Sequence, residues 1–322
     1  MAIGPWVRLH GISISQLPSG GTGVASTSQS PSPSPSQPQS QSRTAPLSGT
    51  SPSLQTFIHH ILSESIPFID SVAPRFNVPT SSPTPWKPKG SPRQYASSSA
   101  CVQVYERVVQ GKELDAVEGV SAGCKEETWF CRRSLHRDAA ENGTASWQEF
   151  EHAFRKHHAE SEDAFTPTVI GARQAMSWDC AGIETQVGGE RWHDIRLVVE
   201  EMTHKIDPKP LKNRTFPVVQ LSAALAGCQE FLVMSIPITD FDASPYAEFA
   251  RDKSLVVAAY VSIERIRMIP GSGEVEWIMA TASDARGVLP QWMQNLAVPA
   301  KVAKDVEMFL AWIPSQRNIR AV

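Results

Sequence analysis

The sequence has no long apolar segment. Its longest apolar run, residues 255–263, is about half of the roughly 20 residues that a membrane-spanning helix needs. The first residues, MAIGPWVRLHGISIS, also lack the apolar centre of a secretory signal. We therefore predict a cytoplasmic protein that is neither secreted nor embedded in a membrane.

A strong charge of one sign and a cysteine framework are missing as well. The net charge is -3 and the pI about 6.3, with acidic and basic residues interspersed, so nothing favours a nucleic-acid partner. The five cysteines include no C-x-x-C pair, and their odd number is typical of free thiols in a reducing compartment.

Signatures of common enzyme classes are absent too. The chain has no G-x-S-x-G, P-loop, H-E-x-x-H or paired-glycine dinucleotide motif. His157 and His158 lie in a histidine- and glutamate-rich stretch, but adjacent helix residues diverge by about a quarter turn and cannot easily share one ion. We predict a solvated helix face there, and we expect neither a metal nor a cofactor.

Proline and serine divide the chain. Residues 1–53, which include SQSPSPSPSQPQSQS, have little to bury and predict a disordered tail that acts as a tether or as a docking site for proteins. Residues 54–85 predict an amphipathic helix, capped by Ser53 and ending near Pro67, followed by a linker. Its polar face is poor in basic residues, so we expect it to dock on the main domain rather than on a membrane. We assign residues 86–316 to that domain and 317–322 to a second tail.

Hydrophobic periodicity predicts one strand, two helical segments and then a series of strands. The first strand covers residues 127–134, and Ser146 with Glu149 forms a capping box for the first helix. Residues 161–178 predict further helix, with Pro167 in an early turn. The later strands are predicted at 192–205, 215–225, 230–238, 255–268 and 274–283. The glycines at 271 and 273 predict a tight turn between the last two.

A last helix is predicted after Pro299. Its buried stripe comprises Val302, Val306, Phe309, Leu310 and Ile313. Its other side is predicted to carry Lys301, Lys304, Asp305 and Glu307. A long antiparallel sheet curls and needs a cover for its concave face, and this helix is the longest apolar candidate. We therefore predict an α+β fold in which a curled sheet grips a helix and leaves space for a ligand.

The C-terminal part resembles a known family. The stretch AAYVSIERIRMIPGSGEVEWIMATASDARGVLPQWMQNLAVPAKVAKDVEMFLAWI is similar to the second half of a START domain, including the loop GVLPQW before the final helix. Upstream, ETWFCRRSLH, RTFPVVQL and EFLVMSIP resemble DUF3074, a fungal domain-of-unknown-function branch of the START-like (Bet v 1-like) superfamily. The resemblance implies a helix-grip fold with an internal cavity for a sterol, phospholipid or other apolar molecule. It also leaves open a catalyst, because the superfamily includes polyketide cyclases and aromatases.

Two adjacent carboxylates are the main candidates for chemistry. Glu200 and Glu201 lie in a predicted strand, where neighbouring side chains point to opposite faces, so one of them should face the enclosed side. Burial would raise the pKa of that carboxyl and suit it to acid–base work or to hydrogen bonding with a ligand. In an enzyme, His204 and Arg265 would join them; the alternative is an ion pair with an arginine on the sheet surface. Arg132 and Arg133 leave the same two options.

A larger set is expected to contact a ligand. Asp284, Arg286 and Trp292 follow the last strand and either gate the cavity or only turn the chain. The candidate ligand-binding residues are Trp178, Val199, Glu201, Tyr260, Trp277, Met279, Asp284, Arg286, Trp292, Val302 and Val306.

Three functions remain open at this stage. The first is binding, with or without transfer, of a hydrophobic small molecule such as a lipid, sterol or polyketide-like compound, with transient membrane contact. The second is a cyclase or pericyclase of fungal secondary-metabolite biosynthesis. The third is an adaptor that acts through its Pro/Ser-rich tail.

Overall fold

Long runs of alternating residues form the centre of the molecule. The computed structural model describes residues 4–24, 52–73, 84–117 and 123–320. Its strands are β1 (Thr22–Gly23), β2 (Lys87–Pro88), β3 (Gln103–Val109), β4 (Glu127–Arg137), β5 (Val169–Ser177), β6 (Thr185–Val187), β7 (Glu190–His204), β8 (Arg214–Leu225), β9 (Glu230–Pro237), β10 (Val256–Val257), β11 (Ala259–Ile269) and β12 (Glu274–Asp284).

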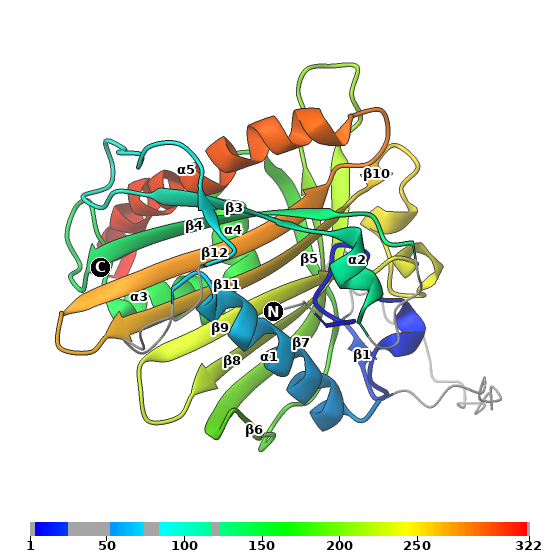
Figure 1. Cartoon of the computed structure of the whole chain (residues 1–322), viewed down its shortest axis with the longest axis horizontal. Helices are drawn as coiled ribbons and strands as arrows, with labels where there is room; N and C mark the ends of the chain where they lie inside the picture. Colours follow the sequence, from blue (N-terminus) through cyan, green and yellow to red (C-terminus); the bar gives the residue numbers. More distant parts are fainter. Residues whose placement is uncertain (1–3, 25–51, 74–83, 118–122, 321–322) are drawn as a thin grey trace, which may run out of the picture.

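These strands form one sheet within the described residues, in the order β1-β5-β7-β8-β9-β11-β12-β4-β3-β2, with β10 added to β8 and β6 added to β7. The pairs along the main path are antiparallel. Gly271 and Gly273 have φ values of 76° and 70° and form the predicted tight turn between β11 and β12. The predicted curled antiparallel sheet is confirmed (Figure 1).

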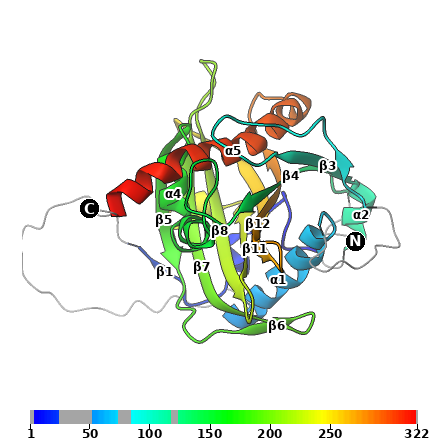
Figure 2. The same cartoon turned by 90° about the vertical axis from the view of Figure 1, so that its left-hand side faces the viewer.

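The helical segments surround this sheet. They are η1 (Ile14–Gln16), α1 (Leu54–Asp70), α2 (Gly111–Asp115), α3 (Trp147–Phe150), the π-helical η2 (Glu151–Lys156), α4 (His158–Phe165), η3 (Phe241–Ala243), η4 (Phe249–Arg251) and α5 (Gln291–Arg320). Figure 2 shows the green segment from α3 to α4 inside the curl of the sheet, with α5 crossing above it. We call the side of the sheet that these helices cover the helix face. Among the described helices, none is both long and apolar enough to cross a membrane.

An aromatic cluster fills one end of the helix face. The ring of Trp277 lies 4.7 Å from that of Phe154, 5.4 Å from Phe309 and 5.5 Å from Phe150, measured between ring centroids. Burying a side chain of this size stabilises the fold by about 1.5–3 kcal/mol. The cluster joins β12, α3, η2 and α5, so it fixes the distance between the sheet and its helices at this end.

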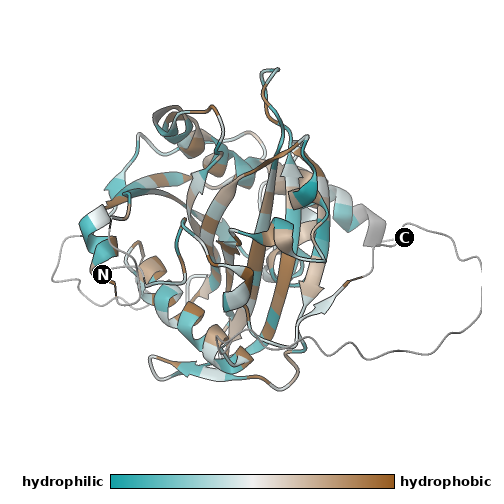
Figure 3. Cartoon of the chain, turned by 90° about the vertical axis from the view of Figure 1, so that its right-hand side faces the viewer, coloured by the Kyte–Doolittle hydropathy of each residue, from teal (hydrophilic) through white to brown (hydrophobic). Residues whose placement is uncertain are grey.

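The opposite side, which we call the α1 face, is covered by α1. Ser53 accepts a hydrogen bond from the Thr56 N–H at 3.2 Å and caps this helix as predicted. The helix docks on the sheet through Phe57, Ile58, Ile61 and Leu62, each with none of its surface exposed. Figure 3 shows that the central strands are largely apolar, while α1 alternates between polar and apolar residues.

Residues 4–24 also belong to this layer. Ile12 N–H donates to the Pro237 carbonyl at 2.9 Å, and Val7 and Leu17 are buried. Gly11 has a φ of 78°, and a side chain there would meet the Pro237 carbonyl oxygen at 2.3 Å. This corrects the expected tail of residues 1–53 over this stretch, because its few apolar residues match an open site on the sheet. Residues 25–51 lie outside the described residues.

Two other helix boundaries differ from the sequence predictions. The predicted helix at 161–178 is wrong beyond Phe165, because β5 begins at Val169, two residues after Pro167. Helix α5 begins at Gln291 rather than after Pro299, which lies inside it. Its predicted stripe is confirmed, since Val302, Val306, Phe309, Leu310 and Ile313 are all buried.

Candidate functional site

Arg132 occupies the middle of the helix face. Only 2% of its surface is exposed. Its Nη2 lies 3.0 Å from Glu264 Oε1 and its Nε 3.8 Å from Asp305 Oδ2. Its guanidinium lies 3.8 Å from the centre of the Trp277 ring. One buried cation is therefore held between two carboxylates from different elements, β11 and α5.

A chain of polar contacts continues from Glu264 across the sheet. His158 Nε2 lies 3.9 Å from Glu264 Oε2, and His158 Nδ1 lies 3.2 Å from Gln220 Nε2. Gln220 also donates to Glu200 Oε2 at 3.3 Å. We call this connected set the polar row; it comprises Arg132, Glu264, Asp305, His158, Glu162, Gln220 and Glu200.

Two carboxyl side chains of the polar row are partly accessible to solvent. The side chains of Glu162 and Asp305 are 29% and 30% exposed. Burial nevertheless raises the pKa of both; Arg132 lowers the pKa of Asp305, Glu162 and Glu264 raise it, and the result is about 7. Burial also raises the pKa of Glu200, which is 2% exposed. Three carboxyls whose pKa values burial raises therefore gather between α4, α5 and the sheet, and that of Asp305 is about 7.

The central strands are incompletely covered beside this row. Tyr260, Ser262 and Met279 lie on β11 and β12 and face the helices, yet each is half-buried rather than buried. Phe216 and His204, on β8 and β7, are half-buried too. Helix α5 packs mainly on β4, β3 and α4, and it reaches β12 through the contact between Phe309 and Trp277. Water therefore reaches a strip of the helix face next to the polar row.

Aromatic side chains border this strip. The ring of Phe216 lies 5.5 Å from that of Tyr260 and 5.4 Å from that of His204. Burial and, to a smaller extent, the charge of Lys301 on α5 lower the pKa of His204 to about 4. His204 is therefore a neutral, largely apolar ring at neutral pH rather than a cation.

The loop before α5 closes one end of the strip. Arg214, at the start of β8, donates to the Ala285 carbonyl at 2.9 Å and to the Arg286 carbonyl at 3.2 Å. Asp284 accepts the Arg286 N–H at 2.8 Å. Arg286 has a φ of 50°, a conformation that favours glycine, so this loop is held in a strained turn. The side chain of Trp292, the predicted gate, lies outside the described part of the chain.

The structure brings several of the predicted site residues together. Glu200, His204, Tyr260, Trp277 and Met279 all lie on the helix face, as their registers require. Val302 and Val306 are buried on α5, and Val306 belongs to the same apolar cluster as Trp277. These residues share one face of the sheet, and their role in binding a ligand stays a prediction.

Other candidates lie elsewhere. Val199 and Glu201 lie on the α1 face, and Glu201 accepts the N–H groups of Glu248 and Ala250 at 3.0 and 2.7 Å. Arg265 is also on that face, paired with Asp70 of α1 and with Glu276. This corrects the expectation that Glu201 and Arg265 face the enclosed side, because strand alternation turns odd-numbered residues of β7 and β11 away from it.

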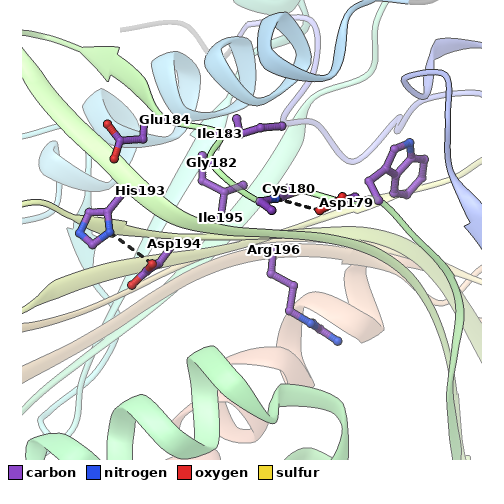
Figure 4. A pocket seen from close by; sticks show the side chains of 11 residues that line it. Asp179, Cys180, Gly182, Ile183, Glu184, His193, Asp194, Ile195 and Arg196 are labelled. Atoms are coloured by element: carbon purple, nitrogen blue, oxygen red, sulfur yellow. Dashed lines mark hydrogen bonds and ion pairs between the residues drawn. The ribbon is translucent and has the colours of Figure 1, made fainter.

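Trp178 is placed elsewhere too. Its indole N–H donates to the Pro18 carbonyl at 3.0 Å, so it anchors the N-terminal segment. Near it lies a surface pocket of about 350 Å³ bordered by residues 178–184 and 193–196. Figure 4 shows His193 and Asp194 turned toward each other there, while Arg196 points to the other side of β7.

Sequence reasoning missed five members of the polar row: Glu264, Gln220, His158, Glu162 and Asp305. The last three were given other positions. His158 and Glu162 were predicted to be solvated and Asp305 to lie on the outer side of the last helix, yet all three face the sheet. Asp305 follows Val302 by three residues and precedes Phe309 by four, so the apolar stripe itself carried the signal. A polar residue inside an apolar stripe indicates a buried polar site.

Several buried polar atoms of this region have no hydrogen-bond partner. They include Glu200 Oε1, Arg132 Nη1 and Ser222 Oγ, on residues that are 2%, 2% and 3% exposed. Glu200 Oε1 does lie 3.5 Å from Arg196 Nη1, within ion-pair range. An unpaired buried polar atom costs about 1–3 kcal/mol, so these atoms favour a partner that is not part of the chain.

The comparison with protein families decides the identity of the domain. The family model described as "Protein of unknown function (DUF3074)" matches residues 129–313, more than half of the chain. The chain belongs to this family. The DUF3074 match begins in β4 and ends in α5, so it includes every member of the polar row.

Solved structures similar to this DUF3074 protein include three human proteins. Human STARD10 has a TM-score of 0.49 at 16% identity, covering 75% of this chain and 78% of that one. The human StarD13 (DLC2) lipid transfer and protein localization domain has a TM-score of 0.44 at 11% identity, covering 70% and 88%. Human StAR-related lipid transfer protein 5 has a TM-score of 0.44 at 13% identity, covering 79% and 96%. No curated protein matches the chain.

Proposed function

We propose that the protein binds a hydrophobic small molecule in a recess between the sheet and helices α4 and α5. The observation that carries this proposal is the uneven cover of the two faces. Helix α1 seals its face completely at Phe57 and Ile61, whereas Tyr260, Ser262 and Met279 remain partly accessible on the helix face. A sheet whose central strands stay accessible under a helix leaves room for a guest.

The chemistry along the recess supports an amphiphilic guest. The aromatic rings of Phe216, Tyr260 and His204 lie toward the loop before α5, and the polar row lies deeper. A molecule would place its apolar part against the rings and its polar end against the unpartnered atoms of Arg132 and Glu200. The recess therefore suits a lipid, sterol or polyketide-like compound better than a small polar metabolite.

The proposal is tested by blocking the recess. Full-length protein is purified from a eukaryotic host, and its small molecules are extracted and identified by mass spectrometry. Ser262→Trp would place a large ring among small neighbours, and we expect it to lose the co-purified molecule while remaining folded. The matched control is Val108→Trp on the outer strand β3, where the side chain is 40% exposed. An empty wild-type protein, without a thermal shift across a lipid panel, would contradict the proposal.

Transient membrane contact would follow from the loop before α5. Val288, Leu296 and Met293 are 80%, 72% and 45% exposed, an apolar surface at the end of the recess. Lys212, on the neighbouring loop, is exposed, and its carbonyl accepts a hydrogen bond from Arg214. Apolar side chains beside lysines suit a bilayer that contains anionic lipid.

Co-sedimentation with vesicles tests this contact. We expect Val288→Asp/Leu296→Asp to release the protein from vesicles containing phosphatidylserine, and the Leu135→Asp control, at a residue 37% exposed on β4, to stay bound. Equal binding of both variants would remove membrane contact from the proposal without affecting ligand binding.

A cofactor-independent cyclase or isomerase is the second candidate. It is favoured by Glu200, whose pKa burial raises and whose Oε1 has no hydrogen-bond partner. A carrier should keep its ligand after Glu200→Gln at a cost of about 1 kcal/mol. An enzyme that uses this carboxyl should lose on the order of a hundredfold in rate.

The proposal also includes a cytoplasmic location and protein docking through the Pro/Ser-rich stretch. The five cysteines are free, which supports a reducing compartment such as the cytoplasm, to be tested by cell fractionation. Protein docking through the Pro/Ser-rich stretch would involve residues 25–51, which lie outside the described residues.

A further inference from the structure

The charges of the polar row do not balance. Four carboxyls converge there from α4, α5, β7 and β11: Glu162, Asp305, Glu200 and Glu264. The permanent cations beside them are Arg132 and Arg196, and His158 is charged only when protonated. Lys301 lies farther along, near His204. Among these described members of the row, four carboxyls face two arginines, and Glu160 adds a further acidic group near Glu200.

The arginines are already engaged. Arg132 lies between Glu264 and Asp305 and against the Trp277 ring, although its Nη1 has no hydrogen-bond acceptor. Arg196 lies 3.5 Å from Glu200 and donates to Gln174 at 2.7 Å. An anionic ligand entering here would meet four carboxyl groups but only two arginines, each of which already has a carboxyl partner. Its carboxylate or phosphate would be repelled rather than held.

A cationic group of a ligand would instead be attracted by the carboxyl groups of the polar row. Glu200 Oε1 is buried and accepts no hydrogen bond, and Asp305 and Glu162 keep nearly a third of their side chains accessible. An ammonium group has three donors and could pair with these carboxyls in place of the protons that burial favours. The groups that face Asp305 are Arg132 from β4, Glu264 from β11 and Glu162 from α4.

We propose, resting on the proposed ligand-binding function, that the recess selects apolar molecules with a protonated amine and excludes the matching carboxylic acids. When the ammonium enters, the Asp305 carboxyl gives its proton to water and becomes the carboxylate that pairs with it. The net charge of the recess stays the same, and one proton appears in solution for each carboxyl that was neutral before.

Three probes of equal chain length test the proposal. Decylamine, 1-decanol and decanoate are titrated into the full-length protein by calorimetry at pH 7.5, below their aggregation limits. We expect decylamine to bind at least about tenfold more tightly than decanoate, with decanol between them. The heat of binding is measured because the chain has nine tryptophans, which would confuse a fluorescence signal.

A variant and a control locate the effect. Asp305→Asn should reduce the preference for amine over acid severalfold, while Glu307→Gln, the same loss of charge on the same helix, should leave it unchanged. If Asp305→Asn does not fold, the wild-type protein still decides: titration in two buffers of different ionisation enthalpy should show proton release with decylamine that increases from pH 8 to pH 6, and none with decanol.

The outcomes separate this inference from the proposed function. Decanoate binding as tightly as decylamine, or decylamine binding without proton release, would overturn the amine preference while leaving ligand binding intact. Failure of all three probes to bind, together with an empty co-purification, would overturn both.

Discussion

At the scale of single residues, neighbours in sequence have different surroundings. Glu200 lies on the helix face, with one oxygen that accepts no hydrogen bond, whereas Glu201 lies on the α1 face and accepts hydrogen bonds from two backbone N–H groups. Strand alternation explains this difference, and the sequence predicted the alternation but not which carboxylate faced the helices. The two residues therefore offer an internal comparison.

Substitution of these two glutamates should separate stability from binding. Glu201→Ala removes one carboxylate partner of Arg173 and leaves two N–H groups unpaired, and we expect it to destabilise the fold by roughly 3 kcal/mol in urea unfolding. Glu200→Gln should change stability by less than about 1 kcal/mol but alter the ligand affinity. Equal losses of stability in both variants would contradict the assignment of the two faces.

Asp305 gives a pH-dependent contribution to stability. Its pKa is raised from 3.8 to about 7 in the folded protein, so the folded state binds the proton more tightly than the unfolded state does. Its contribution to stability is therefore greatest below about pH 4, decreases as the pH rises to about 7 and is constant above that.

Asp305→Asn should remove this dependence. We expect the variant to be more stable than the wild type by about 2 kcal/mol at pH 8, less than the full pKa shift implies because the side chain is partly accessible. The two proteins should be nearly equal at pH 4.5. Thermal unfolding at both pH values measures the difference, and a difference independent of pH would exclude Asp305 as the titrating group.

At the scale of elements, periodicity predicted most strands and the stripe of α5. Periodicity failed for segments whose secondary structure is decided by pairing with distant strands rather than by their own sequence. Residues 169–177 were predicted to be helical but form strand β5, because they pair with residues 198–204 of β7. Strand β3 was not predicted, since its pairing with β4 depends on a partner about 25 residues away. Register and long-range pairing decide such segments, and neither is visible in a short window.

The N-terminal segment is the least expected element. Residues 4–24 are held by Glu64, which accepts the Val7 N–H at 2.8 Å, and by Glu127, which accepts the Leu9 N–H at 3.0 Å. Its sequence has few apolar residues, so composition alone could not reveal that they match the sheet. The hydrogen bonds to these two glutamates therefore hold the segment in place in addition to its few buried apolar side chains.

Glu64→Ala should loosen this segment selectively. Loss of the acceptor leaves the Trp6 and Val7 N–H groups without their partner, and we expect faster hydrogen exchange over residues 4–12, with the exchange of β11 and β12 unchanged. The control is Glu113→Ala, a carboxylate that caps the short helix α2 instead. Uniformly faster exchange would show that Glu64 supports the whole fold rather than this segment.

At the scale of the whole molecule, one sheet separates two chemically different layers. The α1 face is sealed by apolar side chains and by ion pairs such as Arg265–Asp70, while the helix face carries the polar row and its half-exposed neighbours. The family resemblance predicted the helix-grip architecture correctly. The position of the polar row could not be predicted, because its members come from segments up to 173 residues apart, Arg132 to Asp305.

Truncation tests how far α1 belongs to the domain. Removing residues 1–84 would expose Ile263, Ile278 and Ala280 of the α1 face to water. We expect such a protein to aggregate or to unfold at least about 10 °C below the full chain, as judged by light scattering and thermal unfolding. A soluble fragment with unchanged unfolding temperature would show that residues 86–316 suffice, as the sequence predicted.

The docking of residues 4–24 has a consequence for the order of folding. Ile14 N–H donates to Asp240, 226 positions later, and Asp70 pairs with Arg265, 195 positions later. Such contacts close long loops, which makes them late events in a folding chain. These segments must therefore wait, with their apolar residues uncovered, until β9 and β11 have been synthesised. We expect the nascent chain to depend on chaperones during this interval.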